Sequence, residues 1–180
     1  MALRFWVFGP LLAAALAGAA FAGPWSTLCA AALGGGLFFW TAVEYAMHRF
    51  AFHGFAPHYQ HHADPTNRSY ILAPLWLALA GAAALWLLFS LAARSWVLGT
   101  WMLAGAIVGY LAYELIHLRI HSANAGGTVL RALRRHHFYH HFASERACFG
   151  VTSPLWDMVF GSLPEASRSS RMRFRHSPPP

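Results

Sequence analysis

Long uncharged stretches alternate with short polar segments along this chain. Gly23-Pro24 is a turn signal between the first two stretches, and Arg94-Ser95 leaves room only for a tight connection between the last two. The pattern therefore predicts two helical hairpins, each followed by a polar segment. Four stretches are apolar and about long enough to cross a bilayer: residues 5–22, 25–43, 71–92 and 96–116.

Two features leave alternatives to four membrane spans. Ala20-Phe21-Ala22 resembles a signal-peptidase site, but the stretch before it exceeds the 7–15-residue apolar core of a typical signal peptide. We therefore expect this first stretch to be retained as a helix. Residues 34–36 are all glycine, and Pro74 lies near the start of the third stretch. A hairpin that only dips into the bilayer is the alternative that these residues leave open.

Composition favours a membrane protein over a soluble one. Charged residues make up 11% of the chain and hydrophobic residues 57%, whereas a soluble domain carries about 25% charged residues. The net charge of +7 comes from arginine alone, and every arginine except Arg94 falls on the side of the polar segments. The positive-inside rule predicts that this side is cytoplasmic, in the cell inner membrane if the source is bacterial.

We thus expect an all-α integral membrane protein, with four transmembrane helices in two hairpins and a cytoplasmic, histidine-rich helical cap. Residues 1–164 are expected to form one membrane-embedded domain, and residues 165–180 a mobile Arg/Ser/Pro-rich tail. The tail favours contact with anionic lipid over nucleic acid, because no nucleic-acid-binding motif accompanies its arginines. Cys29 and Cys148 are expected to be packing residues rather than a disulfide.

Histidine is concentrated in two windows, residues 48–62 and 117–141, which hold all but one of the 12 histidines. Neutral imidazole is the commonest metal ligand, and residues three or four apart share one helix face. His48 and His53 are five apart, so we expect His48 to end the second span and His53 to lie on the following turn. The candidate ligands are too many for one ion and suit two: His48, His53, His58, His61, His62, His117, His121, His137, His140 and His141.

Two carboxylates precede the windows. Glu44 lies four residues before His48, and Glu114 three before His117, so each is expected to accept a hydrogen bond from a histidine on its own helix face. Carboxylates are otherwise few, which argues against a ferritin-like carboxylate-bridged centre. A single histidine in an apolar protein is more often a packing residue, but packing does not account for four spaced motifs at one membrane face. We treat His136 as a neighbour of the ligands.

The order of these motifs resembles the fatty acid hydroxylase superfamily of membrane di-iron oxygenases. The spacings HX4H, HX2HH, HX3H and HX2HH follow one another as in its fatty acid/ceramide 2-hydroxylase branch. The segment Gly150–Gly161 is also similar to the C-terminal signature of that branch. Within it, we expect Trp156 and Asp157 to fasten the segment over the site rather than to take part in chemistry.

The resemblance implies O2-dependent hydroxylation of a fatty acyl chain or related membrane lipid at two histidine-ligated metal ions, iron being expected and zinc an alternative. It also implies O2 as co-substrate, a separate electron-donor protein and no catalytic residue beyond the ligands. Two other functions stay open: a carotenoid or sterol-like lipid hydroxylase or desaturase, and a non-catalytic metal-handling membrane protein. Aromatic residues between the ligands are candidate pocket residues: Phe50, Phe52, Phe55, Tyr59, Phe138 and Tyr139.

Overall fold

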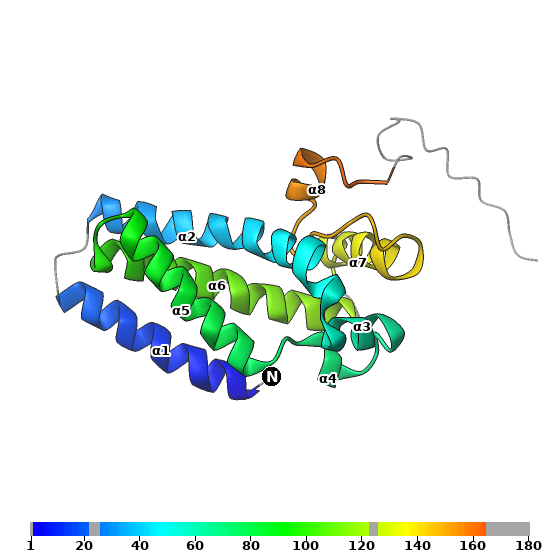
Figure 1. Ribbon diagram of the computed structural model, residues 1–180, viewed down its shortest axis with the longest axis horizontal. Helices are drawn as coiled ribbons and strands as arrows, with labels where there is room; N and C mark the ends of the chain where they lie inside the picture. The colour runs from blue at the N-terminus through cyan, green and yellow to red at the C-terminus, as the bar shows by residue number, and fades with distance from the viewer. Residues whose placement is uncertain (1, 22–25, 123–125, 165–180) are drawn as a thin grey trace, which may run out of the picture.

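The computed structural model describes residues 2–21, 26–122 and 126–164, and within these ranges the chain forms helices and turns but no strand. The tail expected at 165–180 lies outside the described residues. Four long helices lie side by side (Figure 1): α1 (Ala2–Phe21), α2 (Thr27–Ala46), α5 (Leu75–Ala92) and α6 (Trp96–Ile120). The short helices gather at one end of this bundle: η1 (Met47–Ala51), η2 (Phe52–Gly54), α3 (Ala56–Ala63), α4 (Arg68–Ile71), α7 (Thr128–Phe142) and α8 (Leu155–Val159).

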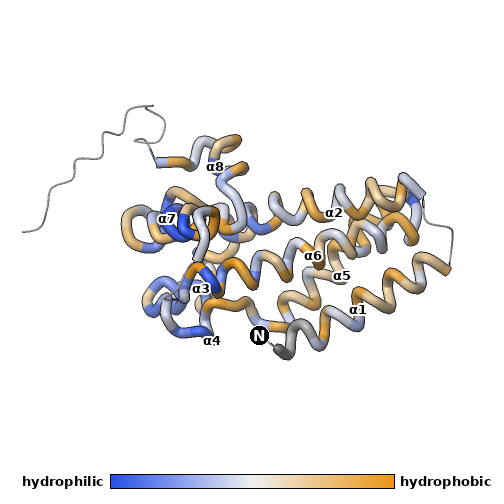
Figure 2. Tube along the Cα trace, turned by 180° about the vertical axis from the view of Figure 1, so that it is seen from behind, coloured by the Kyte–Doolittle hydropathy of each residue, from blue (hydrophilic) through white to orange (hydrophobic). Residues whose placement is uncertain are grey.

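The polar and apolar parts of the molecule are separated along its long axis. Figure 2 shows hydrophobic residues predominating along the four long helices and hydrophilic residues gathered around α3, α4 and α7. This end, formed by the short helices, is called the cap below. The expected all-helical architecture, with histidine-rich helices at one end of an apolar bundle, is confirmed.

Three helical segments are long and apolar enough to cross a membrane: Thr27–Gly54, Arg68–Ala92 and Trp96–Ile120. They correspond to the second, third and fourth apolar stretches of the sequence. The first stretch forms α1, whose apolar part Trp6–Phe21 is shorter. Phe8 of α1 packs edge-on against Tyr110 of α6, with ring centroids 5.2 Å apart. The bundle therefore includes α1, while a fourth membrane span stays a prediction.

Glycines let α2 and α6 approach each other closely. A Cβ atom at Gly36 would lie 1.8 Å from the Met102 carbonyl oxygen, and one at Gly105 would lie 1.9 Å from the Leu33 carbonyl oxygen. Small residues allow such approach between membrane helices. The contact positions the site, because α2 leads directly into the first histidine window and α6 carries the start of the second.

The connection between α5 and α6 is a tight turn, as expected. Arg94 adopts a positive φ of 48° in it, and the Ser95 hydroxyl caps α6 by accepting a hydrogen bond from the Leu98 amide. This turn lies at the end of the bundle opposite the cap (Figure 1). Both cysteines, Cys29 and Cys148, are buried and free.

The close approach of α2 and α6 gives a test of the bundle. Gly105→Ala should lower the free energy of unfolding by about 1–3 kcal/mol, because its methyl group would overlap the Leu33 carbonyl. Gly35→Ala is the matched control, since a Cβ there meets nothing within 4 Å and alanine favours the helix. Thermal unfolding in detergent, followed by circular dichroism, measures both. Equal stability of the two variants would contradict this packing.

Candidate metal centre

The structure brings all ten candidate histidines together in two groups of five. Within each group, one ring nitrogen per residue lies within 4.8 Å of all the others. The first histidine group is His48, His53, His58, His62 and His140. The second histidine group is His61, His117, His121, His137 and His141.

The two HX2HH motifs interlock the groups. In α3, His58 and His62 are four residues apart on one helix face and join the first group, while His61 points into the second. The motif in α7 works in reverse: its outer pair, His137 and His141, joins the second group, and His140 joins the first. Each motif therefore contributes to both groups, and neither group can form without α3 and α7 packed together.

A change in helix type brings His48 and His53 into one group. His48 lies in the π-helix η1, where hydrogen bonds span five residues rather than four, and His53 lies in the 3-10 turn η2 that follows. Their rings stack, with centroids 5.6 Å apart and planes 9° from parallel. A regular α-helix would splay positions five apart by about 140°. His53 lies on a turn, as expected, but His48 does not end the span, because the helical segment continues through η1 and η2 to Gly54.

Buried ring nitrogens without a hydrogen-bond partner show that these groups fit metal ions. His61, His137 and His140 are fully buried, and an unsatisfied buried polar atom costs about 1–3 kcal/mol. A lone pair that no donor reaches is the group that a metal ion needs from imidazole. The nitrogens that fit this description are His48 Nε2 and His140 Nε2 in the first group and one of the two nitrogens of His61 in the second.

The spacing of nitrogens in the second group also fits an ion. His137 Nε2 lies 3.0 Å from the Nε2 atoms of His117, His121 and His141. A ring nitrogen carries either one hydrogen or one lone pair, so these three contacts cannot all be hydrogen bonds. Two nitrogens bound at right angles to one ion, each at about 2.1 Å, would be about 3.0 Å apart.

Burial favours the neutral form, which ligation requires, in three of the candidate ligands. Burial, the largest cause, together with the charges that neighbouring histidines would carry, lowers the pKa of His61 to about 3 and that of His58 to about 2. Burial likewise lowers the pKa of His140 to about 4. At pH 7 these rings therefore keep a lone pair available without first losing a proton.

Glu44 differs from its expected role. Its carboxylate accepts hydrogen bonds from the Val151 and Thr152 backbone amides at 2.9 and 2.7 Å, and from the Thr152 hydroxyl, rather than from a histidine. His48 Nδ1 instead donates to the Phe149 carbonyl. Glu44 of α2 thus binds the backbone of residues 151–152, far along the chain. Helix spacing cannot predict a contact of such long range.

Two other carboxylates lie near the windows. Glu114 is buried and accepts a hydrogen bond from the Tyr110 hydroxyl on the same helix. Glu145, which the sequence analysis did not single out, lies 3.5 Å from His62 Nδ1. Its position four residues after His141 could have indicated this role, since a carboxylate near a helix that carries several ligands can orient a histidine ring.

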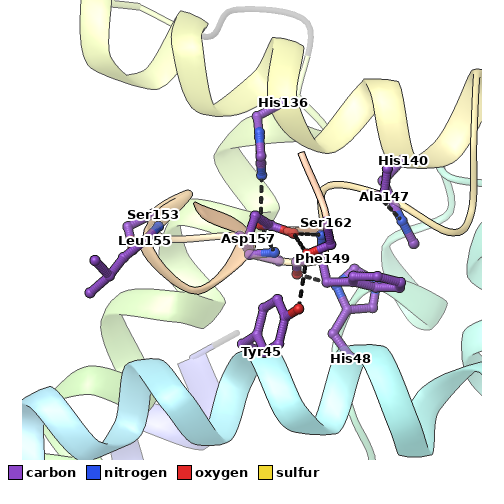
Figure 3. A network of polar contacts seen from close by, with 12 residues as sticks. Tyr45, His48, His136, His140, Ala147, Phe149, Ser153, Leu155, Asp157 and Ser162 are labelled. Carbon is purple, nitrogen blue, oxygen red and sulfur yellow. Dashed lines mark hydrogen bonds and ion pairs between the residues drawn. The ribbon is translucent and has the colours of Figure 1, made fainter. Parts of the chain in front are cut away.

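Asp157 fastens the C-terminal segment, as expected. It is fully buried and accepts hydrogen bonds from the Phe149 and Gly150 amides, the Ser162 hydroxyl and His136 Nε2 (Figure 3). Burial, the largest single influence, raises the pKa of this carboxyl group, but these hydrogen bonds together outweigh it and leave the pKa lowered. His136 therefore belongs to neither group and binds this aspartate instead.

Trp156 completes the attachment of α8 to the bundle. Its indole N–H donates to the Thr41 hydroxyl of α2 at 2.9 Å, and its ring packs beside Phe38. Both expected fastening residues are thus confirmed in that role.

An apolar cavity of about 270 Å³ opens beside the cap, between α2, α5 and α6. Its walls include Leu77 and Ala78 of α5 and Ile107 of α6, and its end nearest the histidines is formed by Phe52 and Tyr113. Apart from Glu44 and the tyrosines, the lining side chains are apolar. A cavity of this character binds hydrocarbon rather than a polar ligand.

A second, smaller pocket lies next to this cavity and reaches one histidine of each group. It measures about 20 Å³ and shares Phe52, Ala73 and Tyr113 with the large cavity. Its wall includes His58 of the first group and His117 of the second. Of the candidate aromatic residues, Phe52 and Phe55 line this pocket, whereas Phe50 and Tyr59 are each 74% exposed.

Comparison with known proteins identifies the class. Residues 33–162 match the family model described as fatty acid hydroxylase, and the chain belongs to this family. The hydroxylase domain of a solved structure, full-length scs7p, superposes with a TM-score of 0.80 at 27% identity, covering 89% of this chain and 65% of that one.

The relatives narrow the resemblance to one branch. The chain is 32% identical over 140 residues to dihydroceramide fatty acyl 2-hydroxylase FAH1 of Arabidopsis thaliana, covering 72% of this chain and 59% of that protein. It is 33% identical over 142 residues to human fatty acid 2-hydroxylase, covering 71% and 38%. The chain thus spans well under two thirds of their length. The expected resemblance to the 2-hydroxylase branch is confirmed.

The two groups predict two separable ions. In His61→Ala, one ligand of the second group is lost, so the protein should bind one divalent ion tightly instead of two. Gln60→Ala, at the exposed neighbouring position on α3, is the control and should bind two. Elemental analysis of purified protein after equilibration with Co2+ measures the ratio. Two tightly bound ions in His61→Ala would contradict the assignment of this residue.

Proposed function

We propose that the ten histidines hold two metal ions, iron in the cell, and that the protein uses O2 to hydroxylate a fatty acyl chain of a membrane lipid. The observation that carries this proposal is the small pocket that shares three lining residues with an apolar cavity and is lined by one histidine of each group. Membership of the fatty acid hydroxylase family supports it. So do the relatives, which are named as hydroxylases of fatty acids or ceramides.

The cavity suits an acyl chain that enters from the bilayer. Its α5 wall belongs to a helix with several outward-facing apolar side chains, Trp76 and Leu79 among them. A chain lying along α5 and α6 would pass Ala78 and Ile107 and end against Phe52 and Tyr113. Beyond these rings, its terminal carbons would face His58 and His117. In this arrangement, one C–H bond of the substrate would lie near a histidine of each group.

The reaction must balance electrons as well as atoms. One O2, two electrons and two protons convert a C–H bond to C–OH and release one water. When bound, a pair of redox-active metal ions supplies the site at which O2 is reduced. The protein's own residues bind the chain in an apolar cavity, exclude water from it and keep the ligand rings neutral.

The two electrons require a separate donor protein, which we place at the cap. A surface hollow there is lined by two arginines, Arg49 and Arg146, and one acid, Glu145, and it reaches His53 of the first histidine group. Two arginines on this rim suit a donor with an acidic surface. The hollow would bring that donor within reach of the metal ions without crossing the lipid cavity.

We further propose that α1 crosses the membrane as a fourth span and that the cap is cytoplasmic. The helix has 20 residues, about the length that a bilayer requires, and it packs within the bundle through Phe8. Arginines of the described chain cluster at the cap, while Arg94 lies at the other end, in keeping with the positive-inside rule.

The two other functions raised by the sequence are not favoured. The relatives act on fatty acids or ceramides by name, which weighs against a carotenoid or sterol-like substrate. A metal carrier has no need of an apolar cavity beside its ligand groups.

Lipid analysis tests the proposed activity. Membranes from cells that express this chain under 18O2 should contain a lipid whose acyl chain has gained one labelled hydroxyl group. Cells that express His140→Ala, in which a ligand of the first histidine group is missing, should lack it. An unlabelled hydroxyl group, or equal product from His140→Ala, would refute metal-dependent hydroxylation by this site.

Filling the cavity tests where the substrate binds. Ala78→Phe should lower kcat/KM for a long-chain substrate at least tenfold, because the added ring would occupy the path of the acyl chain. Metal content should stay at two ions. Ala80→Phe, at an exposed position on the same helix, is the control and should retain activity. Equal kinetics of the two variants would place the substrate elsewhere.

Single cysteines test the orientation. A membrane-impermeant maleimide added to intact cells should label Ala92→Cys, near the α5–α6 turn, and should label Ala143→Cys, in the cap, only after the membrane is opened. Both positions are exposed, while the native cysteines are buried. Labelling of Ala143→Cys in intact cells would reverse the proposed topology.

A further inference from the structure

The loop that links α7 to α8 contacts only one of the two histidine groups. Its Phe149 carbonyl accepts a hydrogen bond from His48 Nδ1 at 2.5 Å, and its Ala147 carbonyl accepts one from His140 Nδ1 at 2.8 Å (Figure 3). His48 and His140 both belong to the first histidine group. Within the described chain, no hydrogen bond joins residues 147–152 to the second histidine group.

These two hydrogen bonds determine which nitrogen each ring can offer to an ion. Donation from Nδ1 places the hydrogen there and leaves the lone pair on Nε2. The Nε2 atoms of His48 and His140 are both buried without a partner. The loop therefore fixes the tautomer and the direction of two of the five rings in the first histidine group.

Two carboxylates from different elements hold this loop by four consecutive backbone amides. Asp157 of α8 accepts from Phe149 at 2.9 Å and from Gly150 at 2.8 Å. Glu44 of α2 accepts from Val151 at 2.9 Å and from Thr152 at 2.7 Å. We call these two carboxylates, with residues 147–152, the carboxylate clasp.

The clasp leaves the loop little freedom to shift. A Cβ atom at Gly150 would lie 2.1 Å from the Ser153 carbonyl oxygen and 2.9 Å from Asp157 Oδ2, so the absence of a side chain lets the aspartate reach the backbone. The Cys148 amide also donates to the Ser162 carbonyl, and the Ser162 hydroxyl bridges Tyr45 and Asp157. A loop without a helix of its own is thus fixed at both ends and in the middle.

We propose that Asp157 and Glu44 are positioning residues for the first histidine group alone: by holding the loop, they direct the Phe149 and Ala147 carbonyls onto His48 and His140 and so set the metal affinity of that group. The proposal rests on the proposed function, in which each group holds one ion. The rings of the first histidine group are then oriented by the clasp, whereas those of the second group are oriented only by the packing of their own helices.

The two carboxylates differ in whether the corresponding amide side chain, Asn or Gln, can keep their hydrogen bonds. Each Asp157 oxygen accepts a hydrogen bond from a backbone N–H. In Asp157→Asn, the side-chain NH2 replaces one of these oxygens in either orientation. It then faces a backbone N–H, and two donors cannot form a hydrogen bond. Glu44 Oε1 accepts both backbone amides, and Oε2 contacts only the Thr152 hydroxyl. Glu44→Gln can keep these contacts, because its oxygen can replace Oε1 and its NH2 can donate to the hydroxyl.

The experiment measures Co2+ affinity by visible absorption, with a competing chelator, in variants that leave one group intact. In the His61→Ala background, only the first histidine group binds. There, Asp157→Asn and Glu44→Ala should weaken binding about 10–100-fold, the usual cost of losing a group that orients a ligand. Glu44→Gln should stay within about threefold. In the His53→Ala background, where only the second group binds, all three substitutions should have little effect.

The controls separate this proposal from its alternatives. Asp64→Asn, at an exposed aspartate, should leave both affinities unchanged. An equal loss in both backgrounds would mean that the clasp only stabilises the fold, and no loss in either would mean that it does not act on the metal; both results overturn the proposal. If Asp157→Asn does not fold, the comparison of Co2+ affinity between Glu44→Ala and Glu44→Gln tests the proposal. Failure of the unsubstituted protein to bind two ions would instead refute the proposed function.

Discussion

Buried imidazole nitrogens without hydrogen-bond partners are the constraint on which the rest of the structure depends. Rings from both histidine windows lie packed together at one end of an apolar bundle, and several present lone pairs to one another. Each unsatisfied nitrogen costs about 1–3 kcal/mol, and no protein group of the described chain hydrogen-bonds to these atoms. A bound cation would offset that cost, so the same atoms that would destabilise the cap make it suited to bind metal ions.

This constraint explains why the bundle is built as it is. The glycine contacts between α2 and α6 bring the ends of the two helices close enough for their histidines to meet α3 and α7. The π-helix η1 turns His48 and His53 to the same side. The apolar cavity shares Phe52 and Tyr113 with the small pocket that reaches His58 and His117, so the packing that brings the histidine groups together also shapes the cavity beside them.

Much of this arrangement follows from the sequence because the spacings are local. Hydropathy predicts the long helices, and the HX2HH and HX3H motifs are helical, as their spacing predicts. The division into groups depends on how α3 and α7 pack, which no spacing contains. The role of Glu44 depends on Thr152, a residue more than a hundred positions away. The partner of His136 is equally remote, since Asp157 reaches it through the fold of the last helix.

The most direct test of the account is the position of the metal ions themselves. Anomalous diffraction at the iron edge, from crystals of the iron-loaded protein, should show two peaks. One should be surrounded by His48, His53, His58, His62 and His140, and the other by His61, His117, His121, His137 and His141. A single peak, or an ion bound mainly by carboxylates, would contradict the account.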